Sequence, residues 1–125
     1  MSSTGSIAEQ AGRRLRLAVT GEPAGIGPDI TAAALAAVAG SPEFLDCNWI
    51  VFGDPALLRE RARTAGVADR WQQLVDAQTV QIAPVALAAP VAAGTLDVRN
   101  AGYLLEQLTR ATDGCLAGDL DALIT

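Results

Sequence analysis

The sequence lacks several side chains on which common enzyme mechanisms depend. Among its 125 residues there is no histidine, and all nine basic residues are arginines. Imidazole acid–base chemistry, Ser-His-Asp triads, Schiff bases and the P-loop lysine are therefore excluded from this chain. Cys47 and Cys115 lie far apart with no histidine to join them, which is not a zinc-binding pattern. We predict no catalytic residue and no metal ligand in this chain.

One segment does carry a pattern of chemical interest. Three glycines and two prolines fall within residues 20–29, TGEPAGIGPD, between an expected strand and an expected helix. Glycines let a backbone approach a ligand closely, and helix N-terminal amides attract anions. The G-x-x-x-G-x-G spacing is neither the dinucleotide fingerprint nor a P-loop, and Glu22 and Asp29 oppose an anion. The residues alone leave two interpretations open, a ligand-contacting loop and a tight structural turn.

Charge and hydropathy exclude two classes of partner. Fourteen acidic residues against nine arginines give a net charge of −5, which opposes binding to nucleic acid. The longest uncharged stretch, residues 77–96, is interrupted by Pro84 and Pro90, so we predict no membrane span. Residues 1–14 have no apolar segment of the kind found in signal peptides. We predict that they form a disordered tail, and that the protein is cytoplasmic.

Strands and helices are expected to alternate around the glycine-rich segment. Strands are predicted at residues 15–20, 48–52, 80–82 and 121–125, and helices at 28–39, 55–65 and 98–118, with a further helical turn within 67–77. Pro28 and Pro55 suit first helical positions, Asp54 suits an N-cap, and Gly66 suits the residue after a helix. Residues 83–96 are predicted to be irregular. This order indicates an α/β fold with a mostly parallel sheet and flanking helices.

The helix predicted over residues 98–118 is the clearest amphipathic element. Apolar residues recur along it with the helical period, at Ala101, Leu104, Leu105, Leu108 and Ala111. Glu106 and Arg110 have the spacing of a surface ion pair. Tyr103, Trp49 and Trp71 are predicted to serve in packing.

Five segments, taken in order, resemble the 4-hydroxythreonine-4-phosphate dehydrogenase (PdxA) family. They are GEPAGIGPD at 21–29, VFGDP at 51–55, PV to GTL between 84 and 96, NAGYLLE at 100–106 and GCLAGDLDALIT at 114–125. The family usually has a proline after the threonine that precedes the first segment, whereas here Thr20 is followed directly by Gly21. Family members are two or three times as long. The resemblance therefore identifies residues 15–125 as the N-terminal portion of a two-subdomain dehydrogenase.

The resemblance implies a reaction and a set of cofactors. It implies NAD- or NADP-linked oxidation of the secondary alcohol of 4-phosphohydroxy-L-threonine, with decarboxylation, in pyridoxal 5′-phosphate biosynthesis. It also implies an isocitrate/isopropylmalate dehydrogenase-like fold, a homodimer, and a divalent metal such as Zn, Mg or Co held by histidines. Because this chain has no histidine, those ligands are expected outside it. We therefore expect the chain alone to be inactive.

Few site residues follow from the resemblance. In related dehydrogenases a glycine-rich loop of similar spelling lies beside the dinucleotide, so Glu22, Gly25, Ile26 and Gly27 are the candidate cofactor-binding residues. Thr125 is the candidate substrate-binding residue, because it ends a predicted parallel strand, where open α/β sheets place ligands. An ordinary strand-end threonine stays open as the alternative. Two other functions also stay open, a family member acting on a phosphorylated sugar acid or an aromatic dihydrodiol, and a non-catalytic small α/β binding module.

Overall fold

The computed structural model describes residues 14–125, so residues 1–13 of the predicted tail lie outside the described residues. Its sheet has four strands in the order β3-β2-β1-β4, and every pair of neighbours is parallel. The strands are β1 (Leu15–Val19), β2 (Cys47–Gly53), β3 (Val80–Pro84) and β4 (Ala122–Ile124). The predicted α/β fold with a parallel sheet is confirmed.

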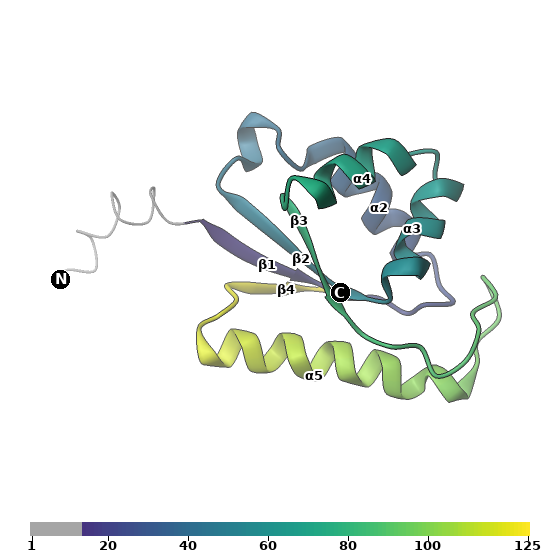
Figure 1. Ribbon diagram of the computed structural model, residues 1–125. Coiled ribbons are helices and arrows are strands. Elements are labelled where there is room, and N and C mark those ends of the chain that lie inside the picture. The colour runs from purple at the N-terminus through teal and green to yellow at the C-terminus, as the bar shows by residue number, and fades with distance from the viewer. Residues whose placement is uncertain (1–13) are drawn as a thin grey trace.

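Helices cover both faces of the sheet (Figure 1). On one face lie α2 (Gly27–Val38), α3 (Pro55–Thr64) and α4 (Ala68–Asp76), and on the other lies α5 (Ala101–Ala117). Short 3₁₀ turns, η1 (Pro42–Phe44) and η2 (Val98–Asn100), precede β2 and α5. Alternate residues of β2 enter two separate cores, since Trp49 and Val51 pack with the three helices, and Ile50 and Phe52 pack with α5. Burial on both faces explains the continuously apolar β2 sequence.

Local sequence signals set the boundaries of α3 and the end of α5 as predicted, whereas α5 begins at Ala101, after η2, and not at residue 98. Asp54 caps α3, because its Oδ2 accepts a hydrogen bond of 2.9 Å from the amide of Leu57. Gly66 follows α3 with a φ of +76°, a left-handed conformation that glycine adopts without strain. Gly118 ends α5 in the same way, with a φ of +84°. The segment predicted to be irregular is a loop, except that β3 extends to Pro84.

The apolar stripe predicted for α5 does not face the sheet as a whole, which is a correction. The buried residues of this helix are Tyr103, Gln107 and Ala111, whereas Leu105 and Leu116 are 65% and 83% exposed. The face toward the sheet contains Tyr103, which is predicted to serve in packing, and also Gln107, a polar residue that a hydrophobicity pattern assigns to solvent. Helix α5 therefore presents an exposed apolar face, which Leu96 and Val98 before it extend.

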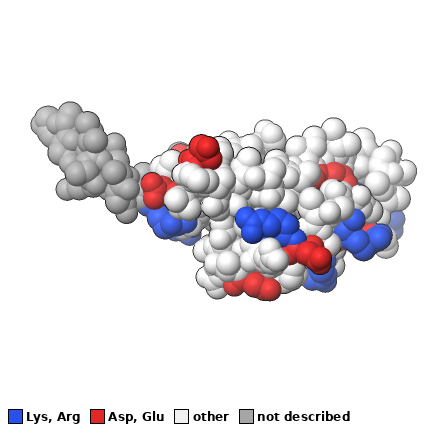
Figure 2. All heavy atoms as spheres, turned by 90° about the horizontal axis from the view of Figure 1, so that it is seen from above, with Lys and Arg blue, Asp and Glu red and all other residues white. Residues whose placement is uncertain are grey.

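The surface is mixed in charge. On the face shown in Figure 2, acidic and basic side chains are interspersed among uncharged atoms. Arg14, the last residue of the predicted tail, donates from Nε to Asn48 Oδ1 at 2.8 Å and from Nη2 to the Cys47 carbonyl at 3.2 Å. Among residues 14–125, no helix combines the length and the apolar character needed to cross a membrane.

Candidate functional site

The candidate site lies at the carboxyl end of β1, where the strand order changes direction. From β1 the chain builds the sheet toward β2 and β3, and β4 is then added on the opposite side of β1. The Thr20 amide donates to the Ile124 carbonyl at 3.0 Å, and Val19 pairs with Ile124 in register. The exposed Thr125 thus lies alongside Thr20. Open α/β sheets bind ligands in the crevice at such a switch point.

The glycine-rich loop, residues 20–28, joins β1 to α2 at this crevice. None of Gly21, Gly25 and Gly27 has a left-handed φ. A Cβ added at any of them would come no closer than 3.6 Å to a neighbouring atom, which is ordinary contact. Gly53 differs, because a Cβ there would lie 2.8 Å from the Tyr103 hydroxyl oxygen. Neither the backbone conformation nor internal crowding thus requires glycine at the three loop positions.

The remaining candidate residues lie on the outer part of this loop. Ile26 is 72% exposed, and it directly precedes Gly27, the first residue of α2. Glu22 folds back on the loop, with its Oε1 accepting from the Ala24 amide at 3.1 Å. The structure therefore brings Glu22, Gly25, Ile26 and Gly27 together in one loop at the same end of the sheet as Thr125.

Two buried polar side chains hold the loop from opposite sides. Gln107 of α5 is fully buried, and its side-chain amide accepts from the Gly21 amide at 2.9 Å and donates to the Gly21 carbonyl at 3.1 Å. Arg61 of α3 donates to the carbonyls of Pro23 at 2.6 Å and Gly25 at 2.9 Å. It also donates to Asp29 Oδ2 at 2.7 Å. We call Gln107 and Arg61 the polar clamp.

Sequence reasoning missed both residues of the polar clamp. Arg61 follows Leu57 by four positions and therefore shares its buried helix face, although its charge suggested solvent. Gln107 has the same spacing from Tyr103 and Ala111, which are also buried. Helical spacing from apolar neighbours was the signal that could have found them.

The polar clamp also changes the electrostatics of the loop. Asp29, in the first turn of α2, is ion-paired with Arg61, whose side chain is only 7% exposed. Asp29, one of the two acidic residues whose charge would oppose a bound anion, is therefore compensated by a buried positive charge. The other, Glu22, is engaged with the loop backbone.

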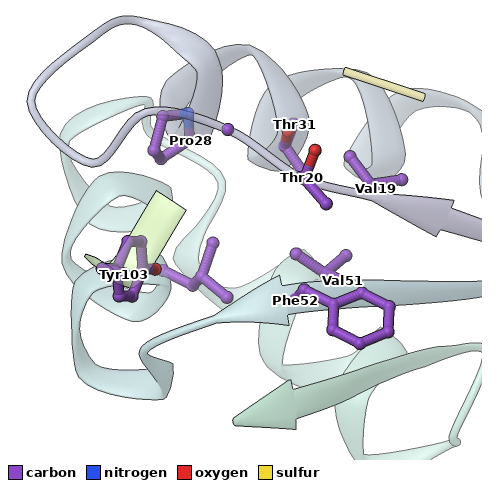
Figure 3. A pocket seen from close by; sticks show the side chains of 9 residues that line it. Val19, Thr20, Pro28, Thr31, Val51, Phe52 and Tyr103 are labelled. Carbon is purple, nitrogen blue, oxygen red and sulfur yellow. The ribbon is translucent and has the colours of Figure 1, made fainter. Parts of the chain in front are cut away.

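The space beneath the loop is small, and Figure 3 shows the side chains that line it. A cavity of about 10 Å³ is lined by Thr20, Pro28 and Tyr103, among others, which is room for about one water molecule. The Thr20 hydroxyl is buried and has no hydrogen-bond partner within the described part of the chain. Tyr103 accepts from the Asp54 amide at 2.8 Å, and burial raises the pKa of its phenol above the ordinary value. A ligand of this loop must therefore lie on its outer side.

An open apolar groove continues from that outer side. It has a volume of about 340 Å³ and runs between Glu22 and the exposed face of α5. Its other lining residues are Leu96, Asp97, Val98, Ala101, Leu104, Leu105 and Leu108. Within residues 14–125, no three His, Cys, Asp or Glu side chains gather as a metal site requires. The described residues therefore do not fit a metal ion.

Curated relatives match most of the chain, although no protein-family model does. A 4-hydroxythreonine-4-phosphate dehydrogenase of Ralstonia nicotianae is 48% identical over 105 residues, covering 82% of this chain and 30% of the relative. The enzyme of that name from Saccharophagus degradans is 39% identical over 112 residues, covering 84% and 32%. That from Serratia proteamaculans is 45% identical over 119 residues, covering 88% and 34%.

The chain spans about a third of the length of the relatives. It belongs to the 4-hydroxythreonine-4-phosphate dehydrogenase family.

Proposed function

We propose that this chain supplies the dinucleotide-facing loop of an NAD- or NADP-dependent dehydrogenase that oxidises 4-phosphohydroxy-L-threonine in pyridoxal 5′-phosphate biosynthesis. The observation behind this proposal is the glycine-rich loop at the switch point of the sheet. Its three glycines are required neither by backbone conformation nor by internal contacts, so their bare backbone is available to a partner outside the fold.

In this proposal each candidate residue has a role. Gly25 and Gly27 allow the cofactor to approach the backbone, and the exposed Ile26 offers an apolar contact for a ring. Glu22 lies at the boundary between this loop and the apolar groove, where its carboxylate can accept hydrogen bonds from hydroxyl groups. Thr125 contributes a hydroxyl for the phosphorylated substrate at the neighbouring strand end. When bound, the dinucleotide would supply the acceptor for the hydride of the substrate alcohol.

The other parts of the proposed enzyme lie outside the described residues. No metal ligand set is found in residues 14–125, so we derive no step through a metal from them. The isocitrate/isopropylmalate dehydrogenase-like fold, the homodimer and the cytoplasmic location are proposed on the family resemblance. The purified chain is accordingly expected to oxidise no substrate alone.

Cofactor binding is tested on the isotopically labelled chain. NAD and NADP are titrated separately while backbone amide shifts are followed by NMR. We expect perturbations at Glu22, Gly25, Ile26 and Gly27, and their loss in Gly27→Ala without loss of stability, because the added Cβ meets no crowding. Gly102→Ala is the matched control, since that position also has open space around it. Absence of shifts with both dinucleotides, or shifts confined to other regions, refutes the assignment of the loop.

The activity is tested in a chimera. Here this chain replaces the matching segment of the Ralstonia nicotianae relative, and reduction of NAD or NADP with 4-phosphohydroxy-L-threonine is followed by absorbance. We expect turnover in the chimera and none in the isolated chain. A soluble, folded chimera that reduces neither dinucleotide would favour the non-catalytic binding module. Turnover with a phosphorylated sugar acid or a dihydrodiol in place of the threonine would assign a different substrate.

A further inference from the structure

The glycine-rich loop is held by side chains from elements far away in the sequence. Gln107 is 86 positions from Gly21, and Arg61 is 36 positions from Gly25. The amide of Gly94, in the irregular segment, also donates to the Ala24 carbonyl at 2.8 Å. The conformation of the loop is therefore fixed mainly by hydrogen bonds between the loop and residues outside it.

Gln107 is an unusual residue for a structural contact of this kind. It is fully buried, in a helix whose outer face exposes leucines. Its amide group satisfies the donor and the acceptor of one residue, Gly21, as a neighbouring strand would. A glutamine with both amide atoms bonded to one backbone residue allows that residue little rotation.

We propose that Gln107 is a positioning residue for the glycine-rich loop, with Arg61 as its counterpart on the opposite side. Gln107 fixes the start of the loop at Gly21, and Arg61 fixes its middle at Pro23 and Gly25. Glu22 lies between these points and Ile26 follows them, so both are held in one arrangement, Glu22 folded back on the loop and Ile26 exposed to solvent. This inference rests on the proposed function only for the identity of the ligand that the ordered loop receives.

Preorganisation has a measurable consequence for binding. A loop that is ordered before the ligand arrives loses less conformational entropy on binding than a loop that must become ordered. Removing Gln107 should therefore weaken binding at the loop even though the side chain touches no ligand. The same removal leaves the amide and the carbonyl of the half-buried Gly21 without these two partners, so the start of the loop should open locally.

The test uses the labelled 125-residue chain and two glutamine substitutions. Gln107→Leu removes both hydrogen bonds while keeping a side chain of similar size. Gln73→Leu makes the same change at an exposed position of α4. In Gln107→Leu we expect hydrogen exchange at Gly21 to accelerate about tenfold more than at Val51 in the central strand. The dissociation constant for NAD or NADP should rise by a similar factor. The control should change neither. Equal acceleration at Gly21 and Val51 would reduce Gln107 to a general packing role and overturn the proposal.

A second variant guards against misfolding of the first. Gln107→Glu keeps the shape, and its protonated carboxyl can make both hydrogen bonds to Gly21, whereas the ionised form cannot donate to the carbonyl. The amide shift of Gly21 should therefore follow one titration in Gln107→Glu that is missing from the unsubstituted chain. A pH-independent shift contradicts the proposal. If neither dinucleotide binds the unsubstituted chain while Gly21 responds as described, the proposed function fails and the positioning role stands.

Discussion

Removal of the Arg61 side chain should destabilise the fold strongly, although this residue lies on a surface helix. Arg61 as a whole residue is only 5% exposed, and its guanidinium donates to two carbonyls and one carboxylate. Hydrogen bonds from a charged donor contribute about 1.5–3 kcal/mol each. Asp29 is 38% exposed, so water can replace part of its interaction once the arginine is removed. We therefore expect Arg61→Met to cost about 2–4 kcal/mol, less than the sum of three bonds.

The assay is urea unfolding followed by tryptophan fluorescence, because Trp49 and Trp71 are both buried in the core beneath α2, α3 and α4. For a chain of this size the expected loss lowers the melting temperature by about 10–15 °C. Arg63→Met is the matched control, since Arg63 is 65% exposed and pairs with Glu60 on the same helix. The control should change stability by less than about 0.5 kcal/mol. Equal effects of the two substitutions would refute the importance of the buried contacts.

Three further outcomes follow from the geometry. Gly53→Ala should destabilise the fold by about 1–3 kcal/mol, because the added Cβ overpacks against the hydroxyl oxygen of Tyr103. In a double-mutant cycle with Tyr103→Phe the two losses of stability should be less than additive, and simple additivity would contradict the close contact. Hydrogen bonds from the side chain and backbone of Arg99 lower the pKa of Asp97 to about 2, so the stabilisation by the ionised Asp97 should persist in mild acid and be lost as the pH falls through that value. A titration midpoint of Asp97 measured by NMR at the ordinary value of about 3.9 would be inconsistent with this pair. Leu105→Glu should leave stability within about 0.5 kcal/mol while reducing self-association in sedimentation, because the residue lies on the exposed apolar face; a large loss of stability would show that this face is covered.

The exposed apolar face of α5 favours self-association of the chain. Leu105 is 65% exposed and lines the groove beside Glu22, and Leu116, further along the same helix, is 83% exposed. The chain is therefore expected to associate through this face, and for that reason the sedimentation experiment is paired with a stability measurement.

Several parts of the fold could be predicted because short-range physics decides them. Asp54, Pro55 and Gly66 act within one helical turn, through a cap, a fixed φ and a left-handed residue, and α3 begins and ends as they indicated. The continuously apolar β2 likewise indicated a strand covered on both faces. The absence of histidine and lysine, which excludes whole classes of catalysis from this chain, required only the composition.

The tertiary structure alone decided how the glycine-rich loop is held and which face of α5 is buried. Gln107 and Arg61 look like surface residues in the sequence, because hydropathy records the cost of burying a polar group and not the partners that offset it. Those partners are backbone atoms that reach the two side chains only when α3 and α5 pack at the carboxyl end of β1. The sequence determined that a glycine-rich loop follows the first strand, and long-range packing determined its shape.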